Sequence, residues 1–218
     1  MKSILIFILM LICTANICNG QYFNAGFRLG GNFCQIDGDN MSGYNLAGLV
    51  GGVFASYQFN KVWEGQFEML YSQKGSARVT TDTSANNING IWDLFRIDYI
   101  EVPVMVNCIL SKKIKLSGGL GGALMIGNHY IGKNNNVVLN NIDAVTKGEL
   151  SGTIGAQYFF TPRISLYGRF TYSLIGINKP NPALSPSLNA TAFYLYDGGM
   201  ANNVISFGIY YYMLKPVK

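Results

Sequence analysis

The chain has a single histidine, His129, which is the first residue to weigh for catalysis. Nucleophilic catalysis with a histidine base needs a serine within hydrogen-bond reach and a carboxylate or amide that orients the ring. Asn128 and Asp143 could orient the imidazole, but the loop expected over residues 128–147 contains no serine. We therefore interpret His129 as a surface histidine beside Tyr130 in an interface belt and predict no catalytic residue.

Metal chemistry has little support in the residue types. The segment Asp-Gly-Asp-Asn at 37–40 resembles the start of a calcium loop, but the remaining ligands and the downstream glutamate are missing. One histidine and the two cysteines that follow residue 20, Cys34 and Cys108, do not make up a zinc set. We interpret 37–40 as a turn and predict no metal and no cofactor.

The composition points to a membrane protein built from strands. Of the 218 residues, 49% are hydrophobic and only 12% are charged, which excludes a disordered chain. After residue 20 the longest apolar runs are about five residues, as at 102–106, whereas a spanning helix needs ~20. Any membrane span of this chain must therefore be a strand.

The first twenty residues are typical of an export signal. Lys2 supplies the positive start, residues 4–12 are almost all apolar, and small residues precede Gln21. We predict a signal peptide over 1–20 and a single barrel domain over 21–218.

Alternation of polar and apolar residues continues through most of the remaining chain and predicts eight strands. They are expected at 22–34, 44–59, 62–76, 94–110, 114–127, 148–160, 163–177 and 202–214. The connections alternate between short turns and long loops. Such alternation is typical of an outer-membrane barrel whose short turns face the periplasm.

The two faces of each strand differ in polarity. In 62–76, Glu64, Gln66 and Glu68 share one face, while Trp63 and Phe67 share the other. A soluble barrel with its apolar face inward is the alternative, since polarity alone does not distinguish the two. Aromatic residues gather on the apolar face near the short turns, where a bilayer interface would lie. They are Phe23, Tyr57, Phe59, Trp63, Tyr158, Phe160 and Tyr211. This girdle favours an all-β fold, an eight-stranded antiparallel up-and-down transmembrane β-barrel in the outer membrane.

The excess of positive charge lies at the short-turn end. Apart from Lys2, it consists of Lys61, Lys112, Lys113, Lys215 and Lys218, and without these six the chain has ten basic and eleven acidic residues. Lysines at that level can meet anionic lipid headgroups. We therefore expect outer-membrane lipids as partners and no nucleic acid.

The polar face carries charges of both signs, which we expect to pair inside the barrel. An eight-stranded barrel is only just wide enough for its own side chains. The predicted lumen charges are Arg28, Glu64, Glu68, Lys74, Glu101, Lys115, Glu149, Arg163 and Arg169. A closed lumen is expected, with a narrow channel along these charges as the alternative.

The two cysteines of the mature chain are expected to remain unpaired. Cys34 shares the parity of the lumen set and Cys108 that of the lipid set, on strands that are not neighbours.

Among the long loops, 178–201 offers the best candidate surface for a partner. Three prolines stiffen it, and they are followed by Phe193, Tyr194 and Tyr196. These aromatic side chains are candidates for contact with an envelope or secretion protein, unless 193–196 extends the last strand above the membrane.

Several segments resemble the PorT-like outer-membrane β-barrel family of Bacteroidetes. They include GFRLGGNF at 26–33, EMLYSQKG at 68–75 and YIEVPV at 99–104. The resemblance covers essentially the whole mature chain and implies an eight-stranded barrel, and the namesake of the family is tied to type IX protein secretion. We therefore expect a non-enzymatic envelope component, with a small lipid-modifying enzyme as the alternative from another class.

Overall fold

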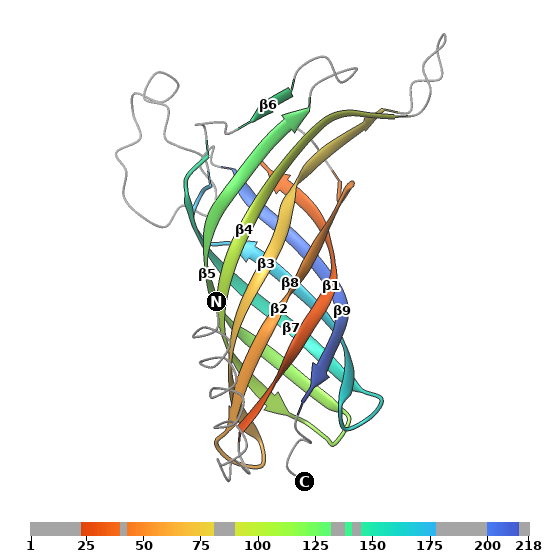
Figure 1. The fold of residues 1–218 in the computed structure, drawn as a ribbon, viewed down its shortest axis with the longest axis vertical. Helices are drawn as coiled ribbons and strands as arrows, with labels where there is room; N and C mark the ends of the chain where they lie inside the picture. Colours follow the sequence, from red (N-terminus) through yellow and green to blue (C-terminus); the bar gives the residue numbers. More distant parts are fainter. Residues whose placement is uncertain are drawn as a thin grey trace, which may run out of the picture.

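A computed structural model describes residues 23–39, 43–80, 90–131, 138–140, 145–177 and 200–213 of the chain. Eight long strands form one antiparallel sheet that closes into a barrel (Figure 1). They are β1 (Phe23–Asp37), β2 (Leu46–Gln58), β3 (Trp63–Thr80), β4 (Gly90–Ile109), β5 (Ile114–Ile131), β7 (Gly148–Phe159), β8 (Ile164–Ser173) and β9 (Ala201–Tyr212). A short strand, β6 (Val138–Asn140), pairs with the loop end of β5. No helix within the described ranges is long and apolar enough to cross a membrane.

Each long strand pairs with its neighbours in the chain, and the first pairs with the last. The closing contact runs from Gly26 opposite Tyr212 to Asp37 opposite Ala201. The predicted eight-stranded antiparallel up-and-down barrel is thus confirmed. The main difference lies in β3, β4 and β5, which have 18, 20 and 18 residues and extend past the other strands at the loop end (Figure 1).

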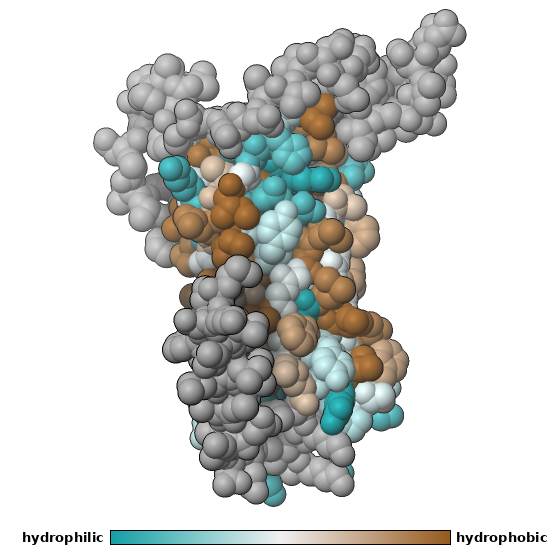
Figure 2. Space-filling view, in the orientation of Figure 1, coloured by the Kyte–Doolittle hydropathy of each residue, from teal (hydrophilic) through white to brown (hydrophobic). Residues whose placement is uncertain are grey.

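Side chains alternate between a polar interior and an apolar exterior. On β3, Glu64 and Glu68 are buried, whereas Phe67 and Met69 on the opposite face are about half exposed. Apolar side chains cover the middle of the outer surface, and hydrophilic ones gather near the loop end (Figure 2). This is the reverse of a soluble barrel, and it suits a wall surrounded by lipid.

The predicted aromatic girdle lies on the outer surface, with all seven side chains exposed. Several of its rings are in contact. The ring centroids of Phe23 and Tyr57 are 4.8 Å apart, and those of Tyr57 and Phe59 are 5.4 Å apart. Rings with a polar edge are stable at the level of lipid headgroups, so the girdle marks the short-turn boundary of the apolar belt.

A β-bulge changes the faces at the loop end of β5. The register between β4 and β5 shifts after Asp98, so that Ile126 is the extra residue. As a result Tyr130 is partly buried and packs against an interior cluster that includes Ile97 and Tyr99. The expectation that Tyr130 accompanies His129 in an interface belt was therefore wrong, because the alternation of faces is interrupted at the bulge.

Candidate functional site

The interior of the barrel gathers most of the predicted charged residues, and the central group surrounds Glu68. Its carboxylate accepts hydrogen bonds from Arg28 Nη1 at 3.0 Å and from Arg169 Nη2 at 2.7 Å. The Tyr210 hydroxyl donates to the same carboxylate at 2.6 Å. All four side chains are buried, so the paired charges hold β1, β3, β8 and β9 together across the lumen.

A second group lies nearer the short turns. Lys115 Nζ lies 2.9 Å and 3.0 Å from the two carboxylate oxygens of Glu64. Asn107 Nδ2 donates to Glu64 at 2.8 Å and to Gln66 at 2.8 Å. Lys115 Nζ also lies 5.1 Å from the centre of the Phe159 ring, which is a cation–π distance.

The third group lies nearer the loops, around Lys74. Its Nζ atom lies 2.6 Å from Glu101 Oε1 and 3.1 Å from Glu149 Oε2. The Ser173 hydroxyl donates to Glu149 at 2.6 Å. One ammonium group thus joins two carboxylates that come from β4 and β7.

Buried apolar clusters also lie in the lumen, and the one toward the short turns is interleaved with the charged groups, because it includes Tyr210 and Phe159. Toward the short turns the cluster consists of Phe54, Phe159, Tyr167, Tyr210 and Tyr212. Toward the loops it consists of Ile36, Phe95, Ile97, Tyr99, Val145 and Ile177. Sequence reasoning predicted neither cluster. Because Tyr211 faces outward, however, the alternation of faces along the last strand could have placed Tyr210 and Tyr212 inside the barrel.

The lumen charges are balanced, with one correction to the predicted set. Eight of the nine predicted residues lie inside and pair, four basic and four acidic. Arg163 does not belong to the lumen set, because it lies exposed in the turn before β8, where its backbone N–H donates to Thr161 Oγ1 at 3.3 Å. Alternation along a strand that started at residue 163 would point Arg163 into the lumen. The strand begins only at Ile164, so this alternation does not apply to Arg163.

The space left between the charged groups is very small. One cavity of about 10 Å³ lies among Arg28, Lys74, Glu101 and Arg169. A cavity of this size holds about one water molecule. At the level of these charged groups, the paired side chains therefore leave room for about one water molecule.

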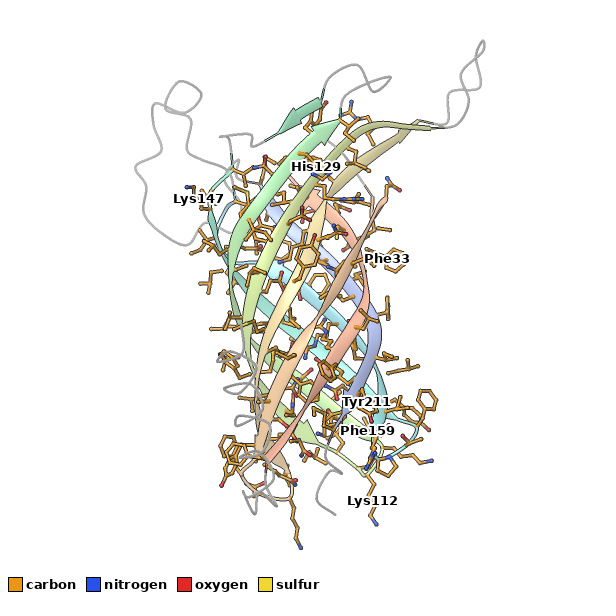
Figure 3. The ribbon with its side chains drawn as sticks, viewed as in Figure 1. Phe33, Lys112, His129, Lys147, Phe159 and Tyr211 are labelled. Atoms are coloured by element: carbon orange, nitrogen blue, oxygen red, sulfur yellow. The ribbon has the colours of Figure 1, made fainter. Side chains whose placement is uncertain are left out.

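His129 lies at the loop end of β5, far from the short turns marked by Lys112 (Figure 3). Its neighbours across the strand pairs are Arg96 on β4 and Asn140 on β6, neither of which is a nucleophile. In the part of the chain that the structure describes, no group of three or more His, Cys, Asp or Glu residues is arranged to hold a metal ion.

In the segment predicted as a turn, the carboxylate of Asp37, the last residue of β1, accepts hydrogen bonds from β1 and β9. Asp37 accepts from Gln35 Nε2 at 2.7 Å and from Asn203 Nδ2 at 3.3 Å. Tyr44 donates to Asn203 Oδ1 at 2.6 Å, and partial burial together with the nearby Asp37 carboxylate raises the pKa of the Tyr44 phenol. These contacts tie the first loop to β1 and β9.

Several predicted features lie outside the described residues. They are the signal peptide over 1–20, the candidate partner contacts Phe193, Tyr194 and Tyr196, and the lysines Lys215 and Lys218. These assignments remain predictions.

The chain is similar to known proteins in its sequence family and in its fold. The family described as outer membrane protein beta-barrel domain matches residues 14–178. The crystal structure of Ail, the attachment invasion locus protein of Yersinia pestis, is similar with a TM-score of 0.51 and 12% identity, over 88% of this chain and 99% of that chain. Ail in complex with the heparin analogue sucrose octasulfate gives a TM-score of 0.51 and 11% identity over the same shares. Neisserial surface protein A gives 0.48 and 12%, over 88% of this chain and 96% of that one. No curated protein sequence matches this chain. At 12% identity, the structural similarity to Ail shows a shared barrel fold alone.

Proposed function

Because the chain belongs to the outer membrane protein beta-barrel domain family, and is therefore an outer-membrane protein, we propose that it is a non-enzymatic interaction protein that the barrel anchors in that membrane. In this role the barrel is a rigid support, and the loops at its outer end make the contacts with partners.

The close pairing of charges across the lumen is the observation that carries this proposal. Four basic and four acidic side chains pair within the barrel, and the cavity left among them has a volume of about 10 Å³. An ion that entered would have to separate buried pairs, which is costly. This arrangement argues against a narrow channel.

The surroundings of His129 argue against the lipid-modifying enzyme. A histidine base needs a nucleophile and an orienting group in hydrogen-bond reach, and its cross-strand neighbours Arg96 and Asn140 do not supply a nucleophile. We expect that His129→Ala leaves any biological phenotype of the protein intact. Loss of the phenotype in this variant would favour the enzyme.

The length of β3, β4 and β5 supports a role for the loop end. Beyond the apolar belt, polar side chains of β3 and β4 are linked on the outer face, where Tyr71 and Gln73 Nε2 donate hydrogen bonds to Asp98 at 2.9 Å and 3.2 Å. These strands therefore continue as a hydrogen-bonded wall above the belt and provide a firm base for contacts with a partner.

The identity of the partner rests on the PorT-like resemblance of the sequence. We propose that the contacts include a component of a protein-secretion assembly, made through loop 178–201 and its residues Phe193, Tyr194 and Tyr196.

Two measurements in the intact membrane test the proposal. Planar bilayers that contain the folded protein should show no steady single-channel conductance, and conductance that changes with Glu68→Gln would establish the channel instead. A photo-reactive amino acid at Tyr196 should form adducts with an envelope protein in living cells, whereas the same amino acid at the lipid-facing Val104 should form adducts only with lipid. Identical adducts at both positions would contradict an interaction role for this loop.

A further inference from the structure

Two apolar grooves lie side by side on the outer surface of the barrel, over β1 to β4. The first has a volume of about 380 Å³ and is lined mainly by Phe23, Tyr57, Phe59, Gly65, Val104 and Val106. The second has a volume of about 340 Å³ and is lined mainly by Ala25, Phe27, Val53, Met69 and Met213. Ala55 and Phe67 line both grooves, so the two grooves are contiguous.

The grooves have small residues as a floor and rings as walls. A Cβ atom placed on Gly65 would lie 2.8 Å from the Phe59 ring, which shows that this ring lies directly over the strand backbone. Phe23 and Tyr57, with ring centroids 4.8 Å apart, form a neighbouring wall. Ring walls over a floor of small residues leave apolar spaces that an acyl chain can fill.

Lysines lie at the short-turn end of the same wall. Lys61 is in the turn between β2 and β3, and Lys112 and Lys113 are in the turn between β4 and β5. The two turns are adjacent, because Ile109 N donates to Val62 O at 2.7 Å. All three lysines are exposed.

No carboxylate neutralises these lysines among the described residues of the short turns. The only nearby acid on the strands, Glu64, points into the lumen and pairs there with Lys115. The short-turn end of this wall therefore combines uncompensated positive charge with two apolar grooves.

We propose that this surface binds one anionic glycerophospholipid of the periplasmic leaflet. Its two acyl chains occupy the two grooves on either side of Ala55 and Phe67, and its phosphate faces Lys61, Lys112 and Lys113. Short turns of an outer-membrane barrel face the periplasm, so the lipid comes from the leaflet made of phospholipid. Lysines close to a membrane surface each attract anionic lipid, and three of them act together. The inference is independent of what the loops at the other end contact.

Native mass spectrometry of the full chain in detergent tests the site. The probes are phosphatidylglycerol and phosphatidylcholine with identical acyl chains, added in equal amounts. We expect the folded protein to retain phosphatidylglycerol with a preference of about tenfold or more. Equal retention of the two lipids would overturn the proposal, and so would stronger retention of a lipid A probe.

Matched variants separate this site from general lipid adhesion. Replacing Lys61, Lys112 and Lys113 together by glutamine should abolish the preference, whereas Arg163→Gln, in the turn before β8, should preserve it. Ala55→Phe should reduce retention of both lipids severalfold by filling the shared floor. The control Ala156→Phe makes the same change at an exposed, outward position of β7. The proposal would be overturned if Ala55→Phe and Ala156→Phe reduced lipid retention equally. It would also be overturned if Arg163→Gln lowered the preference for phosphatidylglycerol as much as the triple lysine variant does. A shift in gel mobility on boiling verifies that each variant still forms a closed barrel.

Discussion

Arg169 Nη2 donates to Glu68 Oε1 at 2.7 Å across the lumen, which joins β8 to β3 although 101 residues separate the two side chains in the sequence. Arg28 approaches the same carboxylate from β1 at 3.0 Å. Glu68 is therefore the one acidic partner of two buried guanidinium groups, and it has no substitute among the described lumen residues.

Glu68→Gln should destabilise the barrel strongly. The variant keeps the size of the side chain but leaves Arg28 and Arg169 buried without a counter-charge, and breaking a buried pair costs about 3–5 kcal/mol. The measurement is the free energy of unfolding in urea, in lipid vesicles. Glu101→Gln is the control, because Lys74 keeps Glu149 as a partner and the loss should be smaller. A smaller loss for Glu68→Gln than for Glu101→Gln would contradict this account.

An arginine on the outer wall should also be unfavourable. Val104 is 58% exposed on the outward face of β4, so Val104→Arg places a charge in the lipid and should lower the free energy of unfolding by about 2–4 kcal/mol near the bilayer midplane. Val104→Ile should be close to neutral. Little effect of the arginine in vesicles would mean that Val104 does not face the hydrocarbon.

Two glycines three residues apart in β5 should respond differently to alanine. A Cβ on Gly119 would lie 2.2 Å from the Val104 carbonyl oxygen, so Gly119→Ala forces the backbone of β4 and β5 apart. We expect a loss of stability of about 1–3 kcal/mol or failure to fold. A Cβ on Gly122 meets nothing within 4 Å, and Gly122→Ala should change stability by no more than about 0.5 kcal/mol. Thermal unfolding of both variants decides the matter, and equal effects would refute the close strand approach at Gly119.

The two cysteines should remain thiols in the native protein. Cys34 is fully buried on β1, and Cys108 is half-buried on β4, which does not pair with β1. After unfolding without reductant, we expect an alkylating reagent to label both cysteines, and in the folded protein we expect Cys34 to react more slowly than Cys108. A native mass two hydrogens below that of the reduced mature protein would show a disulfide instead.

Sequence alternation predicted most of the barrel because a wall between lipid and a polar lumen imposes strict parity on each strand. Glu64, Glu68 and Lys74 could be assigned to the lumen in this way. The prediction of faces from alternation failed at a strand end and at a bulge, where the strict parity no longer holds. Arg163 precedes its strand by one residue, and the bulge after Asp98 reverses the parity of Tyr130.

The partners within the lumen could not be predicted from the sequence. Parity places a charge inside but gives neither its height nor the strand opposite, and both depend on the tilt and stagger of the closed sheet. Thus the pairing of Lys74 with both Glu101 and Glu149 could be identified only in the structure. The extension of β3 to Thr80 was also missed, because hydrogen bonding continues above the belt without a polar and apolar alternation.

The charge groups of the lumen also constrain how the protein enters the membrane. The hairpin of β3 and β4 carries Glu68, whose partners Arg28 and Arg169 come from β1 and β8, and it also carries Glu101 and Lys74, which pair with each other but complete their group only with Glu149 of β7. A hairpin that crossed the bilayer alone would expose these charges to hydrocarbon. Insertion and closure are therefore expected to occur as one cooperative event, in which no strand becomes stable in the bilayer before the last strand has joined the first.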